Sequence, residues 1–161
     1  MLNFKDENYL KIIFLFSVIA LISAYFIEHI LGHQPCNLCL IERIPYGIGI
    51  ILILIIFMFK KDDKFLILLL ILTFTFSFII SFYHFGIEQG FFQESSVCGV
   101  KNLTESITKE DLLKQLSEKT ISCKDVTFRI FGLSLTSINI VISLLFIITL
   151  LKIFKKYEKN K

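Results

Sequence analysis

The stretch that decides the fold is QPCNLCLIER, residues 34–43, which separates two long apolar segments and holds two of the four cysteines. Its Cys-x-x-Cys spacing lets two thiols meet over one helical turn, an arrangement that suits reversible oxidation or metal binding. Two small buried thiols at a helix end are the purely structural alternative.

The neighbours of the cysteine pair favour a reactive site. Pro35 suits the first residue of a helix and places Cys36 and Cys39 in its opening turns. There the helix dipole favours thiolate over thiol. Arg43 is four residues beyond Cys39 and shares its helix face, so its charge also lowers the thiol pKa, whereas Glu42 works against this.

The composition indicates a membrane protein with one domain, residues 1–161. The chain is 55% hydrophobic, has 18 Phe and a mean hydropathy of +0.73, which is too apolar for a soluble protein of this length. Its net charge of +3 is small, and its Lys and Arg are scattered, which excludes nucleic acid as a partner.

Four segments have roughly the ~20 residues needed to cross a lipid bilayer: 12–31, 38–59, 65–83 and 130–151. We therefore expect an all-α membrane protein, a four-transmembrane-helix bundle with a long loop, residues 84–129, between the third and fourth helices. No small-residue cleavage site follows the first segment, so we expect it to be a retained helix rather than a signal peptide.

The second helix is expected to begin before Pro45. The apolar run from Pro45 to Phe59 is too short to cross a membrane comfortably. A start near Pro35 or Leu38 gives sufficient length, with Pro45 as an interior kink of a kind that membrane helices tolerate. The cysteine pair then lies at the membrane edge.

The distribution of basic residues predicts the orientation. Ten lysines lie in the two tails and in the connection after the second segment (Lys5, Lys11, Lys60, Lys61, Lys64, Lys152, Lys155, Lys156, Lys159 and Lys161). Opposite them, the first connection carries only Arg43, and the basic residues of the long loop are matched by acids. The positive-inside rule then places both termini in the cytoplasm and the four cysteines at the other face.

The remaining cysteines, Cys98 and Cys123, fall in the long loop, which we expect to be mobile and to face water. Outside a bacterial-type membrane, oxidising conditions favour disulfides, and one close pair plus one distant pair suggests two of them. The distant pair either staples the loop or exchanges electrons in series with the close pair.

Two further features leave alternatives open. Residues 108–119 have the pattern of a short amphipathic helix, either resting on the membrane surface or serving as an ordinary loop helix. His84, at the outer end of the third segment, is either a donor in a ligand pocket or an ordinary interfacial residue.

The order of these features resembles the disulfide bond formation protein B (DsbB) family over nearly the whole chain. The most specific match is Pro35-Cys36-x-x-Cys39 followed by Glu42-Arg43, and residues 131–133 (FGL) before the fourth helix support it. The loop between Cys98 and Cys123 is the part least like the family.

The resemblance implies an enzyme of the bacterial inner membrane that reoxidises a periplasmic thioredoxin-like (DsbA-like) dithiol protein and passes the electrons to ubiquinone or menaquinone. It implies redox disulfides Cys36–Cys39 and Cys98–Cys123. Cys98 would form the mixed disulfide with the partner, and Cys123 would exchange with Cys36. Cys39 would then face the quinone, with Arg43 polarising a quinone oxygen. Apart from the resemblance, we expect His84 as a further quinone-binding residue, and we expect no metal ligands.

Two rival functions remain open for a chain with these features. Vitamin K epoxide reductase-like proteins are also small bundles with a Cys-x-x-Cys, but in them the loop pair precedes the membrane pair, whereas here Cys36 and Cys39 come first. The other rival is a membrane scaffold without enzymatic activity, in which the four cysteines, with His84, hold zinc.

Overall fold

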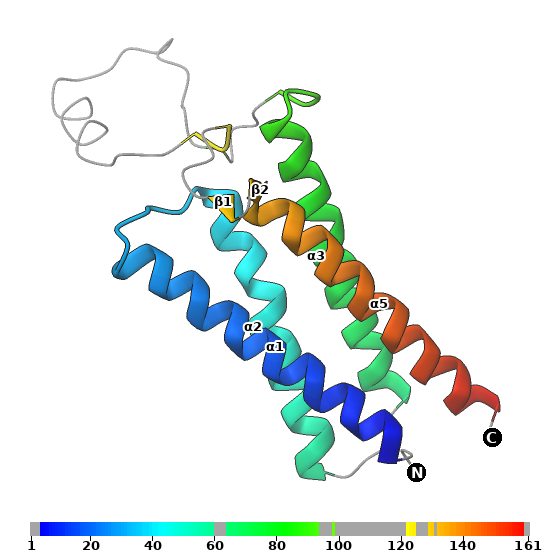
Figure 1. The fold of residues 1–161 in the computed structure, drawn as a ribbon. Helices are drawn as coiled ribbons and strands as arrows, with labels where there is room; N and C mark the ends of the chain where they lie inside the picture. Colours follow the sequence, from blue (N-terminus) through cyan, green and yellow to red (C-terminus); the bar gives the residue numbers. More distant parts are fainter. Residues whose placement is uncertain are drawn as a thin grey trace, which may run out of the picture.

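The computed structural model describes residues 4–59, 64–93, 98, 122–124, 129–130 and 132–159. These form four long helices and a small antiparallel hairpin (Figure 1): α1 (Phe4–His29), α2 (Asn37–Phe59), α3 (Lys64–Glu88), β1 (Arg129–Ile130), β2 (Leu133–Ser134) and α5 (Leu135–Lys159). The amphipathic helix predicted over 108–119 lies outside the described residues.

All four helices are long and apolar enough to cross a membrane, which confirms the predicted four-transmembrane-helix bundle. Each helix leaves large apolar side chains exposed on the outside of the bundle, such as Ile22, Ile51, Ile79 and Leu145. A helix satisfies its own backbone hydrogen bonds, so such a surface is suited to lipid.

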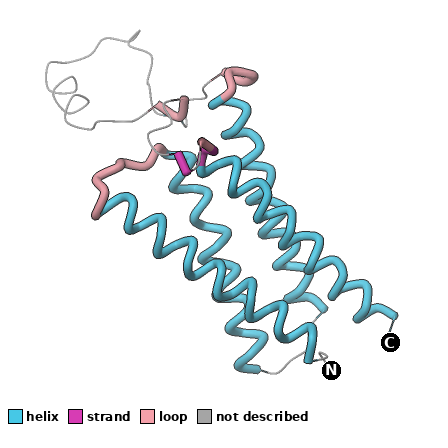
Figure 2. The backbone as a smooth tube through the Cα atoms, viewed as in Figure 1, coloured by secondary structure: helices cyan, strands magenta, loops and turns pink. Residues whose placement is uncertain are grey.

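The helices pack in the order α1, α2, α3 and α5, with α3 in contact with both α2 and α5. The start of α1 and the end of α5 lie at the same end of the bundle (Figure 1), where Lys156 Nζ lies 2.8 Å from Asp6 Oδ2. The connection from α1 to α2, the turn after α3 and the β1–β2 hairpin gather at the opposite end (Figure 2). That end holds the cysteines.

The apolar core lies in the half of the bundle away from the cysteines. Phe74 is fully buried there, with its ring 4.9 Å from that of Phe146 and edge-on to Tyr46. Gly49 on α2 faces this ring, and a Cβ at position 49 would lie only 3.0 Å from Phe74 Cζ. The glycine therefore permits the close approach of α2 and α3.

The start of α2 lies within one residue of the predicted start at Leu38 and not at the alternative start, Pro35. The helix begins at Asn37, so Pro35 and Cys36 precede it instead of forming its first turn, and only Cys39 is helical. Pro45 lies inside α2, as predicted. The backbone N–H of Leu40 donates to the carbonyl of Cys36, which makes Cys36 the residue that caps the helix.

The boundaries of α1, α3 and α5 differ from those predicted from the sequence. Helix α1 begins at Phe4, and α3 continues to Glu88 before the chain turns at Gly90, whose φ is +78°. Helix α5 begins only at Leu135, because the chain first turns at Gly132 (φ +83°) to form the β1–β2 hairpin. His84 consequently belongs to α3 instead of to the loop.

Candidate redox site

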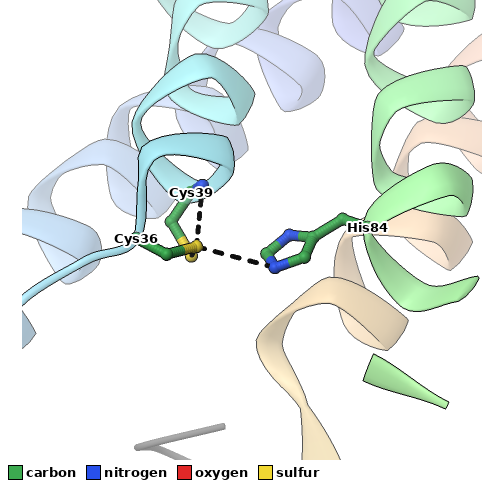
Figure 3. Close-up of side chains that lie close together, drawn as sticks. All are labelled: Cys36, Cys39 and His84. Carbon is green, nitrogen blue, oxygen red and sulfur yellow. Dashed lines mark hydrogen bonds between the residues drawn. The ribbon is translucent and has the colours of Figure 1, made fainter. Parts of the chain in front are cut away.

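The Cys-x-x-Cys pair forms one wall of the site (Figure 3). The Sγ atoms of Cys36 and Cys39 lie 2.8 Å apart, and the backbone N–H of Cys39 donates to Cys36 Sγ at 3.4 Å. Cys36 is buried, and Cys39 is half-buried. A turn that brings the two sulfurs this close requires little movement to close a disulfide.

His84 faces this pair from α3 (Figure 3). Its Nε2 atom lies 3.6 Å from Cys36 Sγ, and its Nδ1 atom lies 2.9 Å from Glu42 Oε1 on α2. The side chain is 2% exposed, so His84 is an interior residue and not an interfacial one. Of the two alternatives that the sequence left open for His84, the structure supports a place in a pocket.

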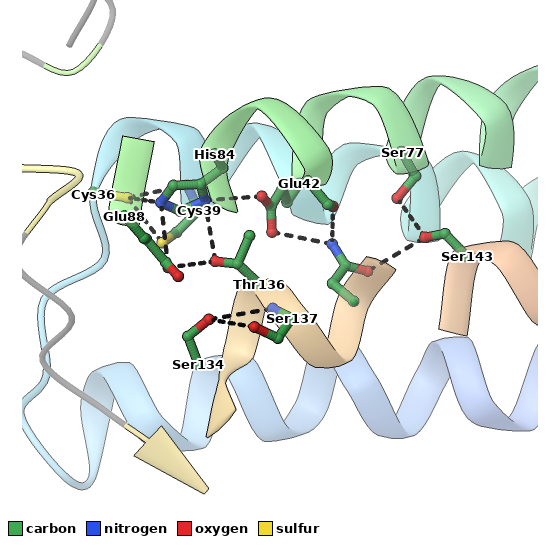
Figure 4. A network of polar contacts seen from close by, with 12 residues as sticks. Cys36, Cys39, Glu42, Ser77, His84, Glu88, Ser134, Thr136, Ser137 and Ser143 are labelled. Atoms are coloured by element: carbon green, nitrogen blue, oxygen red, sulfur yellow. Dashed lines mark hydrogen bonds and ion pairs between the residues drawn. The ribbon is translucent and has the colours of Figure 1, made fainter. Parts of the chain in front are cut away.

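A polar network continues from Glu42 into the bundle (Figure 4). Asn139 Nδ2 on α5 donates to Glu42 Oε2 at 3.0 Å and to Ser81 Oγ at 2.7 Å. Asn139 Oδ1 accepts hydrogen bonds from the hydroxyls of Tyr46 and Ser143. Oε2 of Glu42 and both the Nδ2 and Oδ1 atoms of Asn139 thus have hydrogen-bond partners inside an apolar bundle. These contacts orient the Glu42 carboxylate toward His84.

Glu88 is a second buried carboxylate, one turn beyond His84. Its Oε1 atom accepts a hydrogen bond from Thr136 Oγ1 at 2.7 Å and lies 3.9 Å from His84 Nε2. Its Oε2 atom is buried and has no hydrogen-bond partner among the described residues. An unpaired buried acceptor is costly and therefore points to a ligand or a proton at this place.

Arg43, the predicted quinone ligand, is held by α1. Its guanidinium forms an ion pair with Glu28 and lies over the ring of Tyr25, 5.2 Å from the ring centroid. These contacts leave the side chain 16% exposed at the edge of the site. Glu28 thus has a specific role in placing the guanidinium.

The loop cysteines lie against the same pair. Cys98 and Cys123 are 1% and 3% exposed and form one buried cluster with Cys36, Leu38 and Ile87. The expectation that they face water is therefore wrong for these two side chains, because the ends of α2 and α3 cover them. All four cysteines are recorded as free thiols, so the two disulfide pairings stay predictions.

Cys36 and Cys123, which both lie outside the four helices, have opposite acid–base character. The pKa of Cys36 is lowered, because the thiols of Cys123 and then Cys39 donate hydrogen bonds to its sulfur. The pKa of Cys123 is raised, because it is the donor to Cys36 and because it is buried. We therefore expect Cys36 to be the thiolate and Cys123 its protonated partner when both are reduced.

A cavity of about 430 Å³ opens beside these groups between α1, α2 and α5. Its polar lining residues include Cys36, Cys39, Arg43 and His84. The rest of the wall is mostly apolar: Phe16, Ile19, Ala20, Ile27, Leu135 and Ile142. A cavity of this size with a few convergent polar groups suits a small apolar molecule with a polar head.

Three residues of this site were not predicted from the sequence: Glu88, Thr136 and Asn139. A signal was available in the spacing of polar residues within apolar segments. Ser77, Ser81, His84 and Glu88 recur at helical spacing in α3, and Thr136, Asn139 and Ser143 do so in α5. In a membrane helix such a polar stripe faces the bundle interior.

Comparisons with known proteins agree with this architecture. The family model described as "Disulfide bond formation protein DsbB" matches residues 7–153. The chain is 30% identical over 147 residues to the protein named "Uncharacterized protein RP370" of Rickettsia prowazekii (strain Madrid E), which covers 90% of this chain and 86% of the relative. No solved structure matches the chain significantly.

Proposed function

Because this chain belongs to the disulfide bond formation protein DsbB family, we propose that it reoxidises a soluble DsbA-like dithiol protein and delivers the electrons to a membrane quinone. Family membership and the four apolar helices establish a multi-pass membrane protein with disulfide oxidoreductase activity. What we propose beyond this is the identity of the two reaction partners: a DsbA-like protein as the electron donor and a quinone as the electron acceptor.

The contact between Cys36 and Cys123 carries the proposal. A hydrogen bond joins their sulfurs, and Cys39 and Cys98 adjoin them in the same cluster. Thiol–disulfide exchange requires a thiolate to meet a disulfide sulfur directly. A chain of adjoining sulfurs from Cys98 to Cys39 therefore supports electron transfer in series, which a loop staple alone does not need.

The four cysteines pass two electrons from the partner to the Cys36–Cys39 pair by successive thiol–disulfide exchanges. A thiolate of the partner attacks Cys98 of the Cys98–Cys123 disulfide, and the second partner thiol releases the partner in its oxidised form, leaving two loop thiols. Cys123 then attacks Cys36 of the Cys36–Cys39 disulfide and frees Cys39. Attack by Cys98 on Cys123 closes the loop disulfide again and leaves Cys36 and Cys39 reduced, with two electrons transferred.

The cavity beside Cys39 fits a quinone head group. Its wall is mostly apolar, and its polar lining groups include the Arg43 guanidinium and the His84 imidazole. A bound quinone supplies an acceptor for two electrons and two protons. Arg43, oriented by Glu28 and Tyr25, would hold a quinone oxygen, since a guanidinium stays charged in a poorly hydrated site.

The His84 imidazole has a position suited to moving a proton. Nε2 faces Cys36 Sγ, and Nδ1 is held by Glu42, so the ring can take a proton from a thiol at Nε2 while the carboxylate stabilises the resulting charge. We assign the exchange roles to the four cysteines, and the positioning of His84 to Glu42 and Asn139.

We also place the protein in the bacterial inner membrane with both termini in the cytoplasm. The start of α1 and the end of α5 share one end of the bundle with the end of α2 and the start of α3. In the sequence, the ten lysines of the tails and of the connection between α2 and α3 flank these helix termini, and the positive-inside rule assigns such a side to the cytoplasm.

Oxidation of a reduced DsbA-like protein by the purified chain in lipid nanodiscs, with ubiquinone or menaquinone, tests the proposal. We expect many turnovers that depend on added quinone and are lost in Cys36→Ser. Quinone-independent turnover, or turnover by Cys36→Ser equal to that of the parent, would contradict it. A Lys124→Ala variant, changed at an exposed residue next to Cys123, controls for unspecific effects near the site.

A further inference from the structure

Three potential metal ligands converge in the site, independently of any quinone. The Sγ atoms of Cys36 and Cys39 and a ring nitrogen of His84 all lie within 4.8 Å of one another (Figure 3). Two thiolates and an imidazole form a donor set that prefers zinc and other soft or borderline divalent cations.

The distances are close to those of a tetrahedral zinc site. With Zn–S of about 2.3 Å and Zn–N of about 2.0 Å, ligand atoms in a tetrahedron lie about 3.8 Å apart for two sulfurs and about 3.5 Å apart for sulfur and nitrogen. The observed separation of Cys36 Sγ and His84 Nε2 is 3.6 Å. The two sulfurs, 2.8 Å apart, need to separate by about 1 Å, which side-chain rotation in Cys39 can supply.

The groups behind the ligands are also arranged as in metal sites. Glu42 contacts Nδ1 of His84, which fixes the ring with Nε2 directed at Cys36, and Asn139 holds Glu42 in turn. Metal-binding histidines regularly have such a carboxylate on their other nitrogen. The N–H of Cys39 donates to Cys36 Sγ, a contact that stabilises thiolate character.

Charge and an unpaired acceptor add a second line of evidence. A divalent cation neutralises two thiolates, so the loaded site carries no net charge among its ligands and suits a buried position. The Oε2 atom of Glu88 is buried without a partner, and its side chain, 6% exposed, lies beside the His84 ring. This carboxylate, with Oε1 3.9 Å from His84 Nε2, is a candidate for a fourth ligand.

We propose that the reduced protein binds one zinc ion through Cys36, Cys39 and His84, and that metal binding and the Cys36–Cys39 disulfide exclude each other. The proposal goes beyond the oxidase function and does not rest on it. Binding places both sulfurs on Zn²⁺ as thiolates and releases the thiol proton of Cys39, together with that of Cys36 in any molecules in which Cys36 is still protonated. An oxidant such as diamide takes two electrons from the two thiolates and two protons from solvent, forms the disulfide and releases the metal.

Cobalt substitution tests the site without an activity measurement. In the full-length chain carrying Cys98→Ser and Cys123→Ser, the remaining cysteines are the two proposed ligands. This protein is reduced and titrated with Co²⁺ in detergent without oxygen. We expect one equivalent to bind with the sulfur-to-cobalt charge-transfer and intense visible bands of a tetrahedral thiolate site. Added Zn²⁺ should displace the cobalt, and diamide should abolish the bands.

Single substitutions assign the ligands. His84→Gln should weaken binding at least about a hundredfold, and Glu42→Gln, which removes only the support behind the ring, about tenfold or more. His29→Gln changes an exposed histidine on α1 and should leave binding unchanged. Absence of tetrahedral bands in the reduced background protein, equal affinity in His84→Gln, or metal retained after diamide treatment would each overturn the proposal.

Discussion

Glu42 on α2 and His84 on α3 are 42 positions apart in sequence, and their side chains meet at 2.9 Å in the interior of the bundle. This contact fixes the orientation of the imidazole, because its other nitrogen then points at Cys36 Sγ. A carboxylate in an apolar bundle is costly unless it is satisfied, and Asn139 occupies its second oxygen. The redox cysteines thus face a histidine with a fixed orientation.

Removing the charge of Glu42 should slow the enzyme without altering its shape. Glu42→Gln keeps an acceptor for Asn139 but loses the carboxylate that stabilises charged His84. A charge-assisted hydrogen bond is worth about 1.5–3 kcal/mol, so we expect quinone-dependent turnover to fall roughly ten- to a hundredfold. Glu7→Gln, which removes an exposed carboxylate paired with Lys11, is the control and should behave as the parent. Equal rates for Glu42→Gln and the parent would remove Glu42 from the site.

The chain offers a matched pair of cations for testing Arg43. Arg43 pairs with Glu28 and lies over Tyr25 at the site, and Lys64 pairs with Glu158 and lies over Phe154 at the opposite end of the bundle. We expect Arg43→Ala to reduce quinone use roughly ten- to a hundredfold, seen as a higher quinone KM, a lower rate or both.

The controls for this prediction separate charge from geometry. Arg43→Lys keeps the charge but loses the planar guanidinium, so its quinone use should be intermediate. Lys64→Ala should leave quinone use unchanged. If Arg43→Ala saturates with quinone as the parent does and turns over equally fast, then Arg43 only anchors α2 to α1.

The pH dependence of alkylation tests the assignment of Cys36 as the thiolate. A thiolate reacts with iodoacetamide, and a lowered pKa keeps Cys36 ionised as the pH falls. In the reduced protein its alkylation rate should therefore change little between about pH 8 and about pH 6, where an ordinary thiol of pKa about 8.5 loses roughly tenfold per pH unit.

Cys123 provides the comparison within the same molecule. Its pKa is raised, so its alkylation should stay slow over this range and rise with pH. Cys123→Ala removes the main hydrogen-bond donor to Cys36, and the pKa of Cys36 should then rise, so that its labelling falls as the pH is lowered. Mass spectrometry of the labelled peptides measures each rate. A tenfold loss per pH unit at Cys36 of the parent would refute the thiolate assignment.

Single cysteines introduced at the two ends of the bundle test the orientation. In a cysteine-free background, Phe91→Cys lies in the exposed turn after α3, and Lys155→Cys lies near the exposed end of α5. A membrane-impermeant thiol reagent should label Phe91→Cys in intact spheroplasts of an expressing bacterium, and Lys155→Cys only after lysis. The reverse pattern would invert the proposed topology and place the cysteines in the reducing compartment.

The four helices could be predicted because each apolar run has the length of a membrane crossing. The helix ends could not be predicted as well, since the signals there are local. Gly132 starts a turn that delays α5 to Leu135, and α3 continues through His84 to Glu88, five residues past its predicted end. A polar residue at a helix end is compatible with either a continuing helix or a loop.

The cysteines and Arg43 could be singled out because their types and spacing carry chemistry. The partners of His84 could not be identified from apolar periodicity, because helices that face lipid on one side and each other on the other are apolar all round. Which side of α3 faces Glu42 depends on the packing of α2, α3 and α5. Only the polar stripe through Ser81 and His84 marks that side in the sequence.

The most direct test of the central claim counts the partner molecules that one chain oxidises without an acceptor. Fully oxidised, quinone-free protein is mixed without oxygen with excess reduced DsbA-like protein, and the oxidised partner is quantified. Two disulfides acting in series predict about two equivalents per chain, about one for Cys36→Ser, and about one further equivalent for each quinone then added. No oxidised partner, or the same yield from Cys36→Ser as from the parent, would contradict electron transfer from the loop cysteines to Cys36 and Cys39.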